Sequence, residues 1–196
     1  MTNLTKKEKN RRLAESALML ALATILSKVA ISLLHGGSVT LFSQVPIILI
    51  SYRYGVKWGF KTGLAMSVLQ LILGLENFSY VSGIVSFLVV GLCDYLIAFS
   101  ALGFGGMFKN KIKNDVLAIS LGSAIVVFVR FVCHFISGAT VWSGYANDKA
   151  AVVYSLTYNG SYMLPEFIIT IVGVALIAGI YDLNSLEFKT KFKKNK

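Results

Sequence analysis

The sequence has few charged residues for its length. Of its 196 residues, 14% are charged and 56% are hydrophobic, whereas about a quarter of the residues in a soluble domain are charged. So little polar surface cannot cover a globule that faces water. Several apolar stretches approach the roughly 20 helical residues that cross ~30 Å of hydrocarbon. We therefore expect an all-α membrane protein that forms one bundle in a lipid bilayer.

Sequence motifs for catalysis and cofactor binding are also missing. The run Gly103-Phe-Gly-Gly106 lacks the lysine and hydroxyl residue of a phosphate-binding loop. No His-Glu-x-x-His or Gly-x-Ser-x-Gly sequence occurs. Cys93 and Cys133 lie in apolar stretches without metal-binding or disulfide spacing. We expect no metal, no cofactor and no enzymatic activity.

The basic residues are confined to a few segments of the chain. The formal net charge is +10, which by itself would suggest nucleic acid as a partner. However, the Lys and Arg residues gather at both ends of the chain, around Arg53 and at Lys109–Lys113, while the other loops hold only Lys149. Such a bias indicates membrane topology, because basic loops stay on the cytoplasmic side. We therefore expect cytoplasmic N- and C-termini and no nucleic-acid partner.

The apolar stretches predict a six-transmembrane-helix bundle within a single integral membrane domain, residues 1–196. The expected helices cover about 13–34, 41–54, 57–73, 84–105, 115–142 and 151–180, followed by a basic tail at 187–196. The second stretch is short for a span. It is tilted, broken at Pro46, or extended through the following loop into Tyr54.

Several polar side chains fall inside these helices, where a charge is costly unless it has a partner or a function. At 1.5 Å per residue, Asp94, Arg130, His134 and Asn159 lie roughly 12–18 Å from the outer ends of their helices. Their similar depth predicts a polar cavity that opens to the extracellular side. Two simpler interpretations stay open: an Asp94–Arg130 ion pair between two helices, and a hydrogen-bonded core histidine at His134.

Glu166 directly follows Pro165, which removes a backbone hydrogen bond from its helix. Its side chain therefore either caps that irregularity or contacts a ligand. Aromatic residues gather near the outer ends of the same helices, and a membrane-interface belt explains Tyr145. It explains Tyr95 less well, because this residue is deep and adjacent to Asp94. Ring faces attract a cation by roughly 0.5–2 kcal/mol, so a desolvated carboxylate among rings favours an organic cation.

Two segments of the sequence are specific enough to suggest a family. The first runs Arg130-Phe-Val-Cys-His-Phe-Ile-Ser-Gly-Ala-Thr-Val-Trp142, and the second runs Tyr154-Ser-Leu-Thr-Tyr-Asn-Gly160. Together with Gly36-Gly-Ser-Val-Thr and Asp94-Tyr-Leu-Ile-Ala, they resemble the thiamine-specific substrate-binding (S) subunit of energy-coupling factor (ECF) transporters. The resemblance covers about residues 13–180. It implies a multi-pass protein of the cell membrane that binds thiamine tightly and delivers it with a transmembrane coupling subunit and two ATPases.

The resemblance also implies roles for individual residues. The implied substrate-binding residues are Asp94, Tyr95, Arg130, His134, Trp142, Tyr154 and Asn159. Trp142 and His134 would stack against the thiamine rings, and Tyr154 and Asn159 would hydrogen-bond the aminopyrimidine.

In the same family pattern, Tyr95 and Arg130 would face the hydroxyethyl end of thiamine, and Asp94 would meet the cation. The sequence departs from that pattern, with Asp94 in place of a glutamate and Arg130 in place of a lysine. The guanidinium of arginine is planar and spreads its charge over several N–H donors, whereas the ammonium of lysine is a point charge. This difference would alter the preference for phosphorylated thiamine. The first loop also lacks a tryptophan that some members carry, and its paired glycines imply a flexible lid.

Ala17-Leu-Met-Leu-Ala21 forms a small-xxx-small pattern in the first helix. In the resembled family an alanine pair here docks the coupling subunit, while packing within the bundle is the other interpretation. The alternatives for function are an S subunit for a different vitamin or a pyrimidine precursor, a membrane enzyme with His134 and Asp94 as acid and base, and a structural subunit.

Overall fold

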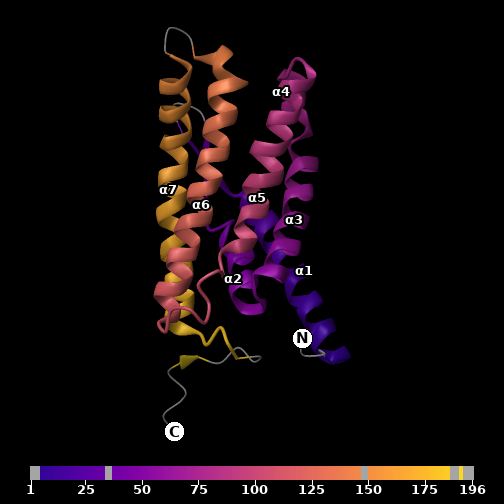
Figure 1. The fold of residues 1–196 in the computed structure, drawn as a ribbon, viewed down its shortest axis with the longest axis vertical. Coiled ribbons are helices and arrows are strands. Elements are labelled where there is room, and N and C mark those ends of the chain that lie inside the picture. Colours follow the sequence, from indigo (N-terminus) through magenta and orange to yellow (C-terminus); the bar gives the residue numbers. More distant parts are fainter. Residues whose placement is uncertain (1–4, 34–36, 147–149, 186–189, 192–196) are drawn as a thin grey trace.

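The computed structural model describes residues 5–33, 37–146, 150–185 and 190–191, and most of them form an elongated bundle of helices (Figure 1). Gly36, Lys149 and most of the predicted tail at 187–196 lie outside the described residues. The elements are α1 (Lys6–Lys28), β1 (Ala30–Ser32), β2 (Ser38–Thr40), α2 (Val45–Tyr54), α3 (Val56–Leu73), η1 (Leu75–Tyr80), α4 (Ile84–Val89), η2 (Val90–Ile97), α5 (Ala98–Ala101), η3 (Leu102–Phe104), α6 (Asp115–Thr140), η4 (Trp142–Tyr145) and α7 (Ala151–Ile180).

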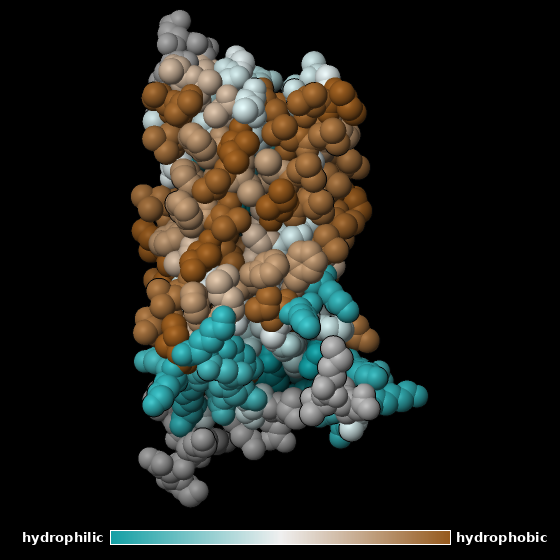
Figure 2. All heavy atoms as spheres, viewed as in Figure 1, coloured by the Kyte–Doolittle hydropathy of each residue, from teal (hydrophilic) through white to brown (hydrophobic). Residues whose placement is uncertain are grey.

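Three of the described helices are long and apolar enough to cross a membrane. They are Ile84–Phe104, Asp115–Thr140 and Ala151–Ile180, close to three of the predicted ranges. The first joins α4, η2, α5 and η3 into one continuous helix whose middle, η2, has π-helical hydrogen bonds. Large apolar side chains such as Leu18 and Ile84 are more than two-thirds exposed. Figure 2 shows the resulting apolar surface above a hydrophilic lower end, as expected for a protein embedded in lipid.

The first helix differs from its predicted range of 13–34. It begins at Lys6, where Thr5 and Glu8 form a capping box, and it ends at Lys28. The next residues form a two-stranded antiparallel hairpin in which Ile31 pairs with Val39. The helix prediction was therefore wrong for residues 30–33, and residue 34 lies outside the described residues. Hydropathy cannot separate a strand from a helix in an apolar run, and the turn residues at 36–37 favour the hairpin.

The second predicted helix is shorter than the range 41–54. Pro46 lies in the first turn of α2, where its missing N–H costs nothing, so the helix starts near Pro46 instead of breaking there. It continues to Tyr54, and Gly55, with φ of 86°, turns the chain directly into α3. With 10 residues, α2 is only about 15 Å long, which is half of the hydrocarbon thickness.

The lower half of the bundle, which is the end with α2 in Figure 1, is packed backbone against backbone. A Cβ atom on Gly59 would lie 2.4 Å from the carbonyl oxygen of Gly103, and one on Gly122 would lie 2.0 Å from that of Gly105. The Ser51 hydroxyl donates to the Gly103 carbonyl over 2.5 Å and accepts from the Gly106 N–H over 2.9 Å. Small residues thus let α2, α3 and α6 approach η3 and the residues after it closely.

Candidate functional site

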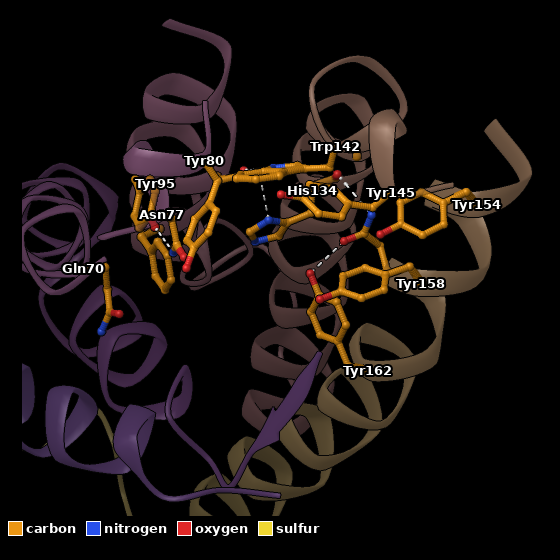
Figure 3. Close-up of a pocket in the computed structure, with 14 residues that line it drawn as sticks. Gln70, Asn77, Tyr80, Tyr95, His134, Trp142, Tyr145, Tyr154, Tyr158 and Tyr162 are labelled. Atoms are coloured by element: carbon orange, nitrogen blue, oxygen red, sulfur yellow. Dashed lines mark hydrogen bonds and ion pairs between the residues drawn. The ribbon is translucent and has the colours of Figure 1, made fainter. Parts of the chain in front are cut away.

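The upper half of the bundle encloses a cavity of about 580 Å³. Its walls come from α3, η1, η2 and α5 on one side and from α6, η4 and α7 on the other. Figure 3 shows Tyr80 and Tyr95 facing Trp142, His134 and the tyrosines of α7 across the space. The lining residues are Gln70, Asn77, Tyr80, Asp94, Tyr95, Phe99, His134, Gly138, Trp142, Tyr145, Tyr154, Tyr158, Asn159 and Tyr162.

Asp94 anchors one wall of the cavity. One carboxylate oxygen lies 3.0 Å from Nδ1 of His134. The other accepts hydrogen bonds from the Ser137 hydroxyl over 2.7 Å and from the indole N–H of Trp142 over 3.0 Å. These contacts orient the imidazole and the indole, and they tie η2 to α6 and η4. A single aspartate thus supplies a negative charge and fixes two rings beside it.

Tyr95 follows Asp94 in sequence and also lines the cavity, because the wider π-helical turn lets neighbouring residues reach the same space. Its hydroxyl donates to the Gly74 carbonyl over 3.1 Å and accepts from Nδ2 of Asn77 over 2.7 Å. A Cβ atom on Gly74 would lie 2.2 Å from that hydroxyl. Tyr95 is therefore held in place by the end of α3 and by η1.

Three tyrosines line the α7 wall at intervals of four residues, so they share one helix face. Tyr154 and Tyr158 are stacked with ring centroids 5.7 Å apart, and Tyr158 meets Tyr162 edge to face at 5.9 Å. Tyr162 in turn meets His134 edge to face at 6.4 Å. Figure 3 shows the three rings one below another, so a ligand in the cavity would meet ring surfaces at several depths.

Asn159 lies on the same wall and is only 4% exposed. Its Nδ2 donates to the backbone carbonyls of His134 and Ser155 over 3.2 and 3.0 Å. Its Oδ1 accepts from the Tyr162 hydroxyl over 2.8 Å. The carboxamide is therefore fixed against both α6 and α7.

Arg130 does not pair with Asp94, so the ion pair considered between these residues is wrong. The guanidinium of Arg130 lies 2.8 Å from the carboxylate of Glu166 on α7 and stacks over the ring of Phe99. Asp94 faces His134 instead. The position of a residue along a helix does not say towards which side of the helix its side chain points. The Asp94–Arg130 pair was considered because the two residues lie at similar depths, which was not enough to predict a contact. Arg130 is not among the lining residues, although Phe99, directly beside it, is.

Glu166 is 2% exposed and joins four parts of the chain. One carboxylate oxygen accepts from the N–H and the hydroxyl of Thr40 on β2, over 2.9 and 2.5 Å. The other accepts from Gln44 at the start of α2 and from Arg130 on α6, both over 2.8 Å. Glu166 therefore ties the hairpin and α2 to α6 and α7, a role that neither sequence interpretation included.

Six of the seven predicted site residues line one cavity, and Arg130 alone lies outside its lining. Sequence reasoning did not assign Tyr158 and Tyr162 to the site, although their spacing from Tyr154 was a usable signal. It missed Gln70 and Asn77, which come from a helix end and a 3₁₀ turn without periodicity.

Among the described residues that line the cavity, Asp94 is the only acidic side chain, and none is Lys or Arg. Arg130, whose charge would have opposed that of Asp94, is instead neutralised by Glu166. The cavity therefore combines aromatic faces with one carboxylate, which is the environment that suits an organic cation. Within the part of the chain that the structure describes, no group of three or more His, Cys, Asp or Glu residues is placed to hold a metal ion.

Three comparisons relate the chain to known proteins. Residues 13–183 match the family described as Thiamine transporter protein (Thia_YuaJ). The chain is 37% identical over 179 residues to the thiamine transporter ThiT of Bacillus subtilis (strain 168), with 85% of this chain and 89% of that protein covered. A solved structure of ThiT from Listeria monocytogenes has a similar fold, with a TM-score of 0.69 and 22% identity, covering 85% of this chain and 92% of that one.

The structural likeness, at that identity, concerns the fold alone. The family match spans most of the sequence, and the Bacillus relative aligns over nearly its whole length. The chain therefore belongs to the Thiamine transporter protein (Thia_YuaJ) family, a family of transport proteins and not of enzymes.

Proposed function

We propose that this protein binds thiamine in the aromatic cavity and is the substrate-binding subunit of an energy-coupling factor transporter. The observation that carries the proposal is the carboxylate of Asp94 in a cavity lined by aromatic rings, with no lysine or arginine among the described residues that line it. Thiamine is an organic cation with two aromatic rings. A curated relative that is 37% identical is named as a thiamine transporter, which supports the same ligand.

The geometry suggests how the cation would be held. Trp142 and His134 are both hydrogen-bonded to Asp94, so their rings stand next to its negative charge. A cation between such rings gains roughly 0.5–2 kcal/mol from each favourable ring face, and the nearby carboxylate adds Coulomb attraction in a water-poor site. Tyr154 and Asn159 line the α7 wall, where the aminopyrimidine would lie.

Arg130 is proposed only as an indirect contributor to this site. The family resemblance placed it toward the hydroxyethyl end of thiamine, but its guanidinium faces Glu166 and stacks over the ring of Phe99. A guanidinium neutralised in this way offers little attraction to a phosphate ester. We therefore expect unphosphorylated thiamine to be the preferred ligand.

We further propose one membrane domain with six crossings, both termini in the cytoplasm, and a location in the cell membrane. The three long apolar helices and the apolar outer surface support the embedding (Figure 2). The start of α1 and the end of α7 lie at the same hydrophilic end of the bundle (Figure 1). The excess of Lys and Arg at that end supports a cytoplasmic location, and the cavity would then open outward.

The proposed coupling subunit would dock on α1. Ala17 and Ala21 are both exposed, and they share a helix face with Leu18, which is 71% exposed. Their exposure supports a docking role over the other interpretation of the pattern, packing of the alanine pair inside the bundle. Small exposed residues in a membrane helix let a second helix approach closely, which supports a partner with transmembrane helices of its own.

A fluorescence titration of the purified protein in detergent tests the ligand. The chain has two tryptophans, and Trp58 lies far from the cavity, where its indole donates to Ser16 in α1. In the Trp58→Phe variant only Trp142 reports, so we expect saturable quenching by thiamine and none by riboflavin. The Trp142→Phe variant, which keeps only Trp58, should lose the signal. Quenching by another vitamin but not by thiamine would contradict the proposal.

A further inference from the structure

The orientation of the Asn159 carboxamide follows from its neighbours. One terminal atom of this side chain lies 3.2 Å from the His134 carbonyl oxygen and 3.0 Å from the Ser155 carbonyl oxygen. Carbonyl oxygens only accept hydrogen bonds, so the atom facing them must be the nitrogen. Both of its N–H groups have protein acceptors. The amide oxygen is therefore the polar atom that remains on the side of Tyr162.

The Tyr162 hydroxyl donates its single proton to this oxygen over 2.8 Å. An amide oxygen has two lone pairs, so a second remains for a ligand. The ring of Tyr162 is closely held, since a Cβ atom on Gly37 would lie 2.6 Å from it, and since Tyr158 and His134 contact it edge to face. Gly37, with φ of 75°, is the residue type that such a contact requires.

We propose that Tyr162 is a positioning residue that sets the ligand specificity of the α7 wall. The His134 and Ser155 carbonyls set which end of the Asn159 carboxamide faces the ligand. Because the Tyr162 hydroxyl gives its single proton to the amide oxygen, it leaves no donor facing the ligand, so this wall accepts a hydrogen bond from a ring-bound amino group and disfavours an oxo group in the same place. The inference rests on the proposed function, because the amino group is the only hydrogen-bond donor on the thiamine rings. An oxo group would place its oxygen against the amide oxygen of Asn159, and because both are acceptors neither would have a hydrogen-bond partner.

A comparison of two ligands tests the inference. Binding of thiamine and of its analogue with an oxo group in place of the amino group is measured by titration calorimetry. We expect the unmodified protein to bind thiamine with an affinity at least about tenfold higher than the oxo analogue, because a buried acceptor without a hydrogen bond costs that much in binding free energy. In Tyr162→Phe, water can fill the place of the hydroxyl and donate to an oxo group as well as accept from an amino group. The preference should therefore fall by about three- to tenfold.

Tyr52→Phe is the matched control. Tyr52 is fully buried, and its hydroxyl donates to Asp115 over 2.7 Å outside the cavity. This variant loses the same kind of hydrogen bond and should keep the preference for thiamine. The inference is overturned if the unmodified protein binds both ligands equally, a measurement that needs no variant, or if Tyr162→Phe keeps the full preference. Absence of any thiamine binding would instead overturn the proposed function itself.

Discussion

In the lower half of the bundle the helix backbones touch at glycines, whereas in the upper half the helices stand apart around large rings. Gly59 and Gly103 leave no space for a methyl group between α3 and η3. Above them, Trp142, Tyr158 and Tyr162 line a cavity of about 580 Å³. The two halves therefore differ in what lies between their helices, which is closely packed backbone at the glycines of the lower half and ring-lined space in the upper half. Residues of the two halves should therefore respond differently to substitution.

Gly103→Val should have the largest effect. The new side chain would begin 2.4 Å from the Gly59 carbonyl oxygen, which neither backbone can avoid, and we expect a loss of more than about 3 kcal/mol of stability. The measurement is the yield of monodisperse protein on size-exclusion chromatography in detergent. In Gly160→Ala the added Cβ meets nothing within 4 Å, so that control should fold normally. Normal folding of Gly103→Val would show that the lower half is less closely packed than described.

Glu166→Ala should have the next largest effect, because Glu166 lies where the two halves join. Its loss leaves Arg130 buried without its partner, which costs about 3–5 kcal/mol. Thermal unfolding should show a large drop in the melting temperature. The exposed Glu76→Ala serves as the control, with a change of less than about 0.5 kcal/mol. Adding Arg130→Met to this variant should recover part of the lost stability. If the stability changes of the two single variants simply added in the double variant, the Arg130–Glu166 pair would not be stabilising as described.

Trp142→Ala should affect binding more than folding. We expect thiamine to bind more weakly by more than about 1 kcal/mol if this ring is a central anchor, with a smaller change in melting temperature than for Gly103→Val. Isothermal titration calorimetry measures the affinity, and Trp58→Phe in the lower half should leave it unchanged. Unchanged affinity in Trp142→Ala would remove this residue from the site.

Ala17→Trp should have the smallest effect on the isolated protein. The side chain is exposed on α1, so stability and thiamine affinity should be close to those of the unmodified protein. Uptake by cells should nevertheless be lost, because the bulk of tryptophan prevents close approach of a partner helix. Phe128→Trp, at a 59% exposed position on α6, is the control and should transport normally. Normal uptake in Ala17→Trp would exclude this face as the docking surface.

Long apolar runs with polar ends made most of the fold predictable. The predicted range 151–180 agrees with α7, and 84–105 agrees with the continuous helix Ile84–Phe104, because membrane helices are marked by length and hydropathy. The hairpin of β1 and β2 was not predictable in this way, since residues 30–34 are as apolar as the helix before them.

The candidate site was predictable in position but not in pairing. Depth along the helices placed Asp94, His134 and Asn159 together, and the cavity contains all three. Which side chain faces which depends on helix rotation and on contacts distant in sequence. Arg130 pairs with Glu166, a residue that the sequence connected with Pro165 or with a ligand but not with Arg130. The hydroxyl of Tyr162 had no sequence signal beyond its spacing from Tyr158.

The pairing of Arg130 with Glu166 also bears on how a loaded protein would respond to the membrane potential. With that pair internally compensated and histidine counted as neutral, the described residues that line the cavity carry one negative charge, from Asp94. A bound thiamine cation would cancel it. The transmembrane field would then exert almost no force on the occupied cavity. For comparison, moving one uncompensated charge across the membrane changes the free energy by about 2.3 kcal/mol per 100 mV. The movement of the occupied cavity through the bilayer would thus depend little on the membrane potential.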